Sequence, residues 1–154
     1  MPFGVNMDGM SDPNLPVGQM MTRQIVTVSL DDSLRVIRDL FDTHHFHHLL
    51  VVVHEKLVGV ISDRDLLKHV SPFVGNSFSE RQQDLATLNR RAHQIMSRSL
   101  VTAEADTTLM EAMQMILQHR ISCLPIVDQR QRPIGIVSWR DILRTLAGDA
   151  VAGQ

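Results

Sequence analysis

The stretch Gly59–Leu67 reads GVISDRDLL, and Gly135–Leu143 reads GIVSWRDIL 76 residues later. Both follow the pattern Gly-φ-φ-Ser-x-Arg-Asp-φ-Leu, in which φ is an apolar residue. Further upstream, Met21–Thr27 (MTRQIVT) resembles Met96–Thr102 (MSRSLVT) at an offset of 75. A register that stays nearly constant over about 50 residues indicates two copies of one supersecondary unit.

Each copy shows the same succession of patterns. A β-rich run is followed by a capped helix, a continuously apolar strand, a second strand and a final helix that begins near Asp63 or Trp139. The β-rich runs are 25–28 and 100–103, the capped helices follow 31–33 and 106–108, and the strands are 49–53 with 57–61 and 124–127 with 134–137. The predicted order is β-α-β-β-α, twice, which is an α/β (α+β) fold.

This repeat sets the expected domain organisation. Residues 18–70 form the first repeat and residues 94–147 the second. Residues 1–17 have little periodicity and are expected to be a flexible arm. Residues 71–93 are expected to link the repeats, with a helix over 79–93 whose charges form a solvated face, and residues 148–154 to form a tail.

Bulk properties restrict the class of protein. The 154-residue chain has a formal net charge of −2 and one cysteine, Cys123. This charge gives no electrostatic basis for binding nucleic acid or an anionic membrane, and one cysteine favours a reducing compartment. No apolar run approaches the roughly 20 residues of a membrane helix, and the N-terminus lacks the features of a signal peptide. We therefore expect a soluble, cytoplasmic protein.

The doubled motif carries the candidate chemistry. Its serine stands where a strand stops and a helix starts, as an N-cap beside free backbone N–H groups. The aspartate three residues later can accept hydrogen bonds from two ribose hydroxyls, and the neighbouring arginine is a forked phosphate donor. Ser-x-x-Asp is also an ordinary capping box, and the doubled pattern alone does not separate these two interpretations.

The ordered set of motifs resembles the cystathionine-β-synthase-type (CBS) repeat family, whose tandem pairs are called Bateman modules. Its markers are Met-Thr/Ser at 21–22 and 96–97, Val-Thr at 26–27 and 101–102, Leu-Pro-Ile-Val-Asp at 124–128, and Gly-φ-φ-Ser-x-x-Asp at 59–65 and 135–141. The resemblance implies a pseudo-two-fold pair of repeats with clefts that bind an adenosine-containing ligand (AMP, ADP, ATP or S-adenosylmethionine). It also implies a non-catalytic regulatory module, a homodimer that signals to a separate partner protein. The alternative is a dimerisation module with empty clefts.

The resemblance also assigns ligand-binding residues by position. One cleft would use Ser62, Arg64 and Asp65, with an apolar wall from Leu100, Val101, Ala103, Ile121 and Pro125. The other would use Ser138, Arg140 and Asp141, with a wall from Ile25, Val26, Val28, Phe46 and Leu50. The family's basic, phosphate-contacting positions correspond to His47 and His48 in the first copy but to Ser122 and Cys123 in the second. We therefore expect two unequal clefts, at least one of which holds a nucleotide.

Histidines 44, 45, 47 and 48 are the main rival signal, because histidine is a common transition-metal ligand. His47 and His48 should point to opposite faces of an extended strand, so we expect no metal site and instead hypothesise that one of them faces the ligand phosphates. No nucleophile–base set, Walker loop or Gly-x-Gly-x-x-Gly loop is present, so the sequence predicts no enzyme. Cys123 and Trp139 fit packing roles, and the cluster Met110, Met113 and Leu117 fits a dimer contact.

Overall fold

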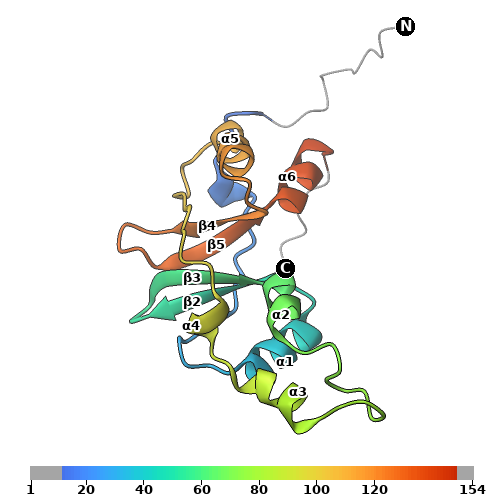
Figure 1. Cartoon of the computed structure of the whole chain (residues 1–154). Coiled ribbons are helices and arrows are strands. Elements are labelled where there is room, and N and C mark those ends of the chain that lie inside the picture. Colours follow the sequence, from blue (N-terminus) through green and yellow to red (C-terminus); the bar gives the residue numbers. More distant parts are fainter. Residues whose placement is uncertain (1–11, 149–154) are drawn as a thin grey trace, which may run out of the picture. The chain divides into compact units, whose positions relative to one another are not determined.

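The structure, a computed structural model, describes residues 12–148. The chain divides into two compact units (Figure 1). The middle unit comprises residues 26–100, and the terminal unit comprises, among the described residues, 12–25 and 101–148. Each unit combines a small sheet with helices, so the expected α+β fold is confirmed.

The middle unit is built on a three-stranded sheet. Its elements are β1 (Thr27–Val28), α1 (Leu34–His44), β2 (His48–Val53), β3 (Lys56–Ser62) and α2 (Asp63–His69). β1 runs parallel to β2, and β2 runs antiparallel to β3. The side chains of Leu34, Ile37, Leu49, Val51 and Ile61 are completely buried, as the apolar spacing of α1 and the continuous apolar run of β2 predict.

The terminal unit repeats this arrangement with a two-stranded sheet. Its elements are η2 (Val17–Gln19), α5 (Leu109–His119), the antiparallel pair β4 (Cys123–Val127) and β5 (Pro133–Ser138), and α6 (Trp139–Leu146). The strand expected over residues 100–103 is reduced to a single parallel bridge between Ala103 and Ile126. Leu109, Leu124, Ile126 and Val137 are completely buried at its centre.

Each unit also contains the segment that precedes the other repeat in the sequence. In the middle unit the N–H of Leu34, the first residue of α1, donates to the carbonyl of Arg90 at 2.8 Å. In the terminal unit the N–H of Leu109, the first residue of α5, donates to the carbonyl of Leu15 at 2.8 Å. The two bonds are related by the repeat offset of 75. The leading segments, residues 15–22 and 90–97, are therefore exchanged between the two repeats.

The exchanged segments also pair with the last strand of each unit. Val60 and Ser97 exchange two backbone hydrogen bonds of 3.1 and 2.8 Å, and Ile136 and Thr22 exchange two of 3.0 and 2.9 Å. The two pairings are equivalent, because Ile136 and Ser97 follow Val60 and Thr22 at the repeat offsets of 76 and 75.

This pairing explains the motif glycines. A Cβ atom at Gly59 would lie 2.9 Å from Cγ of Met96, and one at Gly135 would lie 2.9 Å from Cγ of Met21. Both distances are too short for carbon–carbon contact. A side chain at either position would force the methionine of the exchanged segment to shift, so the close packing of that methionine against the strand favours glycine.

Two expectations need correction in the joining segments. The loose arm does not extend through residues 12–17, because Val17 is completely buried and its N–H donates to the carbonyl of Thr107 at 2.8 Å; residues 1–11 lie outside the described residues, as do residues 149–154 of the expected tail. The single helix over 79–93 is wrong. That stretch forms α3 (Gln82–Ala86), η3 (Thr87–Asn89) and α4 (Ala92–Ile95).

The break in the joining segment has a tertiary cause. Arg90 and Arg91 are extended, with ψ of 156° and 155°, because their backbone runs alongside the start of α1 and bonds to it. Upstream, the carboxylate of Asp84 accepts hydrogen bonds from the Ser71 hydroxyl at 2.7 Å and the Arg81 N–H at 2.8 Å. Those bonds hold the pKa of Asp84 below its ordinary value, against the opposing effect of burial.

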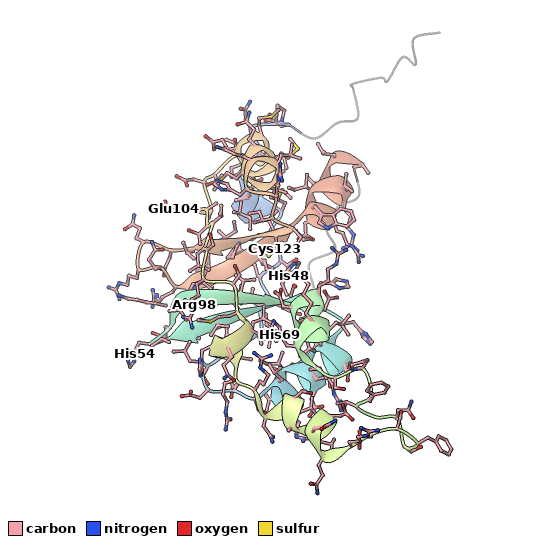
Figure 2. The ribbon with its side chains drawn as sticks, in the orientation of Figure 1. His48, His54, His69, Arg98, Glu104 and Cys123 are labelled. Atoms are coloured by element: carbon pink, nitrogen blue, oxygen red, sulfur yellow. The ribbon has the colours of Figure 1, made fainter. Side chains whose placement is uncertain are left out.

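The turn of the β2–β3 hairpin has a strained backbone. Its two-residue turn, His54-Glu55, has φ of 48° and 67°, and Figure 2 shows His54 at the tip. Such a turn favours Asn-Gly, and left-handed backbone costs other residues about 1–2 kcal/mol each. We expect His54→Asn with Glu55→Gly to raise the free energy of unfolding by about 1 kcal/mol, measured by urea denaturation. Lys56→Gly, one residue further into β3, should instead lower it; equal effects would contradict this account.

Candidate functional site

The first strand–helix junction lies in the middle unit, where β3 meets α2. Ser62 is the N-cap of α2, and its hydroxyl accepts the Asp65 N–H at 3.1 Å. Asp65 Oδ2 in turn accepts the Ser62 N–H at 2.8 Å. These reciprocal bonds form a capping box that fixes the aspartate in the first turn of α2.

The second junction, between β5 and α6 of the terminal unit, has the same geometry. The Ser138 hydroxyl accepts the Asp141 N–H at 3.2 Å, and Asp141 Oδ2 accepts the Ser138 N–H at 2.8 Å. Asp141 is only 6% exposed, and its carbonyl accepts the hydroxyl of Thr145 at 2.8 Å. This aspartate is therefore more buried than its counterpart, Asp65, which is half-buried.

The capping-box interpretation of Ser-x-x-Asp is thus confirmed at both junctions, and each box uses only one oxygen of its carboxylate. All the carboxylate hydrogen bonds at these two positions use Oδ2. Within residues 12–148, Oδ1 of Asp65 and Oδ1 of Asp141 accept no hydrogen bond. Each junction therefore combines a rigidly positioned carboxylate with one unused acceptor oxygen.

The residue between the serine and the arginine distinguishes the two junctions. In the middle unit it is Asp63, whose Oδ2 accepts a 2.8 Å hydrogen bond from Nδ1 of His47. In the terminal unit it is Trp139. The backbone is equivalent in both, because the Asp63 N–H donates to the His47 carbonyl and the Trp139 N–H donates to the Ser122 carbonyl. A histidine–aspartate hydrogen bond at one junction is thus replaced by an aromatic ring at the other.

These neighbours give the junctions different electrostatics. Partial burial pushes the pKa of Asp63 upward, but the hydrogen bond and charge of His47, the N–H of Arg64 and the charge of His48 outweigh burial, so the pKa lies below its usual 3.8. At the other junction the guanidinium carbon of Arg140 lies 5.5 Å from the Trp139 ring centroid, a cation–π contact. Asp63 is not among the site residues that the sequence predicts, although it differs from its counterpart Trp139 when the two copies are aligned.

The predicted apolar residues are distributed over both units. The middle unit contains Val26, Val28, Phe46, Leu50 and Leu100, and the terminal unit contains Ile25, Val101, Ala103, Ile121 and Pro125. Val28, Leu50, Ala103 and Pro125 are buried, whereas the others are partly exposed. Each unit therefore contains one polar junction together with apolar residues on its sheet or at the sheet's margin.

The histidine run is divided by the end of α1. His44 ends the helix, and His45 is its C-cap in the left-handed conformation, with φ of 53°. His47 bonds to Asp63, and His48 begins β2 (Figure 2). Among the described residues, no group of three or more His, Cys, Asp or Glu side chains is arranged to hold a metal ion.

Cys123 is buried at the start of β4 (Figure 2), and burial raises the pKa of its thiol to about 12. Because the thiolate is the reactive species, only about one molecule in ten thousand is reactive at pH 8. We expect Ellman's reagent to label the folded protein at least about 100-fold more slowly than the protein in guanidinium chloride. Stoichiometric labelling of the folded protein at the denatured rate would show that the thiol is accessible.

Helices of membrane-spanning length and hydropathy are not found in the described part of the chain.

Comparison with known proteins follows the same division into repeats. The family model of the CBS domain matches residues 17–72 and 92–148. A CBS domain-containing protein from Dictyostelium discoideum is 32% identical over 132 residues, which cover 84% of this chain and 90% of that protein. Other curated relatives are longer. The chain spans 42% of protein MJ1232 (25% identical over 138 residues, 90% of this chain) and 22% of an inosine-5′-monophosphate dehydrogenase (29% over 127 residues, 82% of this chain), both from Methanocaldococcus jannaschii.

Solved structures also show similarity to pairs of CBS domains. The crystal structure of the CBS domain pair of protein MJ0100, in complex with 5′-methylthioadenosine and S-adenosyl-L-methionine, has a TM-score of 0.71 and 27% identity, and the match covers 86% of this chain and 96% of that one. The family model accounts for most of the sequence at two successive positions. This chain therefore belongs to the CBS domain family and contains a tandem pair of its repeats.

Proposed function

We propose that this chain is a non-catalytic regulatory module that binds an adenosine-containing ligand (AMP, ADP, ATP or S-adenosylmethionine) and, as a homodimer, signals to a separate partner protein. The observation that carries the proposal is the pair of capping boxes, in which a fixed aspartate keeps one carboxylate oxygen unused. The MJ0100 domain pair, which binds two adenosine compounds, supports the choice of ligand class.

The chemistry of the junctions matches a nucleoside. A ribose presents two adjacent hydroxyl groups, and a carboxylate accepts hydrogen bonds from such a pair. Oδ1 of Asp65 or Asp141 can accept from one hydroxyl while Oδ2 retains its bond to the N-cap. The guanidinium groups of Arg64 and Arg140 follow directly in the motif and suit an anionic or carboxylate-bearing substituent on the ribose. The buried apolar residues of each sheet suit an adenine ring.

The hydroxyl and thiol groups near the junctions are hydrogen-bonded or buried, which supports a binding role rather than catalysis. The hydroxyls of Ser62 and Ser138 are engaged in their caps. The thiol of Cys123 is buried with a raised pKa, so it is a poor nucleophile. The proposed effect of a ligand is a shift between conformations through its differential affinity for them.

The test is thermal unfolding with AMP, ADP, ATP, NAD and S-adenosylmethionine, each added separately. A ligand at 100 times its Kd stabilises the folded state by about 2.7 kcal/mol, which gives a clear rise in melting temperature. We expect such a rise for at least one adenosine compound and none for guanosine monophosphate at the same concentration. Absence of a shift with every compound would instead favour a dimerisation module without a ligand.

A further inference from the structure

The loop between α2 and α3, residues 70–81, exposes two aromatic side chains; we call it the α2–α3 loop. Phe78 is 99% exposed and Phe73 is 49% exposed. The repeat itself uses phenylalanine differently, because Phe41 is buried and its ring centroid lies 5.4 Å from that of Phe46. Figure 1 shows the α2–α3 loop, in yellow-green, running out beyond the two helices that it joins. The loop therefore holds apolar surface in water, outside the core of the middle unit.

The polar groups of the α2–α3 loop fold it onto itself. The Gly75 N–H donates to Oε2 of Glu80 at 2.6 Å, and the Phe78 N–H donates to Oδ1 of Asn76 at 3.1 Å. Compact loops are usually packed by their own side chains, whereas here polar bonds supply the order and the aromatic rings stay outside. A single exposed phenylalanine is ordinary, but a preordered loop that presents two of them loses little conformational entropy on binding a partner.

We propose that the α2–α3 loop is the surface with which this chain binds its partner protein, and that Phe78 enters an apolar pocket of that partner beside an acidic group. The proposal deepens the proposed function by naming the partner-binding surface, and it rests on that function for the existence of a separate partner. A projecting ring needs a concave, mostly apolar counterpart, and aromatic residues are enriched at protein interfaces.

The charges of the α2–α3 loop favour a protein over a membrane. Its charged residues are Glu80 and Arg81, and the Glu80 carboxylate already accepts the Gly75 N–H. A segment that binds anionic lipid carries about 4–8 Lys or Arg residues, and this loop has one. Arg81 is exposed, and its guanidinium group complements a carboxylate at the rim of a protein pocket.

α2 connects the α2–α3 loop to the candidate ligand site of the middle unit. The helix begins at the Ser62–Asp65 capping box and ends at its C-cap, Val70, the first residue of the loop. The Ser71 hydroxyl then donates to the Asp84 carboxylate at 2.7 Å, which ties the loop to α3. The seven residues of α2 span about 10 Å. A ligand that shifts this helix would therefore also shift the surface that the partner contacts.

The test begins with the photo-cross-linking amino acid p-benzoylphenylalanine in place of Phe78, in the whole chain produced in its native cells. The same amino acid in place of Val36, which is 43% exposed on α1 of the same unit, is the control. We expect one other protein to be joined through position 78 and not through position 36. A product made of two copies of this chain, or no product specific to position 78, would overturn the proposal.

The protein joined through position 78 is then purified, and its Kd for the whole chain is measured. Phe78→Ser should weaken binding about 10- to 100-fold, as for an anchor residue, and should fold normally because Phe78 is 99% exposed. Val36→Ser should leave the Kd unchanged, and Arg81→Glu should slow association at low salt, as a rim charge does. Equal Kd values for wild type and Phe78→Ser would show that the loop is not the binding surface.

Two further measurements separate this proposal from its alternatives. Wild type should not sediment with vesicles of phosphatidylglycerol and phosphatidylethanolamine; sedimentation that Phe78→Ser abolishes would identify a membrane surface and overturn the proposal. Thermal stabilisation by the adenosine compounds should be the same in wild type and Phe78→Ser. An unchanged partner Kd in a variant that still binds ligand contradicts the loop alone, whereas a wild type without ligand binding contradicts the proposed function.

Discussion

Replacing Met21 with alanine should destabilise residues 101–148 far more than the repeat in which Met21 lies. Met21 is 6% exposed and belongs to the buried cluster that includes Leu109, Leu124 and Ile126. Truncating a buried methionine to alanine costs about 2–5 kcal/mol. The measurement is amide hydrogen exchange followed by mass spectrometry, in which peptides from α5, β4 and α6 should exchange faster while peptides from α1 and β2 change little.

The equivalent methionine of the second copy, Met96, provides a control. Met96 is 8% exposed and packs with Leu34, Ile37 and Ile61 of the middle unit, so Met96→Ala should accelerate exchange in α1 and β2 instead. Met110→Ala, at an exposed site of α5, should cost little in either unit. If Met21→Ala accelerated amide hydrogen exchange only in α1 and β2, the leading segments would not pack on the opposite repeat, and the account would be contradicted.

Replacing Asp65 or Asp141 with asparagine should weaken ligand binding without unfolding the protein. The amide oxygen of asparagine can still accept the N–H of the N-cap serine, so the capping box is largely retained. The second carboxylate oxygen becomes an NH₂ group, which cannot accept a ribose hydroxyl. Hydrogen bonds to charged groups are worth about 1.5–3 kcal/mol, so affinity at an occupied junction should fall roughly 10- to 100-fold.

Calorimetric titration of the two single variants measures this effect, and thermal unfolding without ligand checks the fold. The alanine variants are the comparison, because they also lose the bond from the N-cap N–H to the N3 carboxylate and should be less stable by about 1 kcal/mol. Loss of affinity in one asparagine variant alone would identify the occupied junction. Unchanged affinity in both would show that neither carboxylate holds the ribose.

The local elements could be predicted from sequence because each pattern occurs twice. The capped helices, the continuously apolar strands and the final helices all lie where their periodicity places them. The segments that differ from expectation are those whose structure depends on distant partners. Residues 79–93 have helical spacing, yet Arg90 and Arg91 are extended because their backbone bonds to the start of α1. Val17 follows a stretch without periodicity, yet it is buried in the core of the other repeat.

The capping boxes of the candidate site could be predicted from the sequence, whereas the residues that surround them could not. Ser-x-x-Asp is a local signal, and both capping boxes form within one helical turn. The exchange of Met21 and Met96 between repeats was not visible in the sequence, because a repeat pattern shows which residues are equivalent and not which copy they contact. The contrast between Asp63 and Trp139 was present in the aligned copies, but its meaning depended on finding His47 hydrogen-bonded to one of them.

The most direct test of the binding function is a calorimetric titration of the whole chain with AMP and, separately, with S-adenosylmethionine. The account predicts saturable binding of at least one of them, with no more than two sites per chain because the chain has two Ser-x-x-Asp junctions. The absence of saturable binding of either compound up to a concentration of about 1 mM, which corresponds to a binding free energy weaker than about −4 kcal/mol, would contradict it.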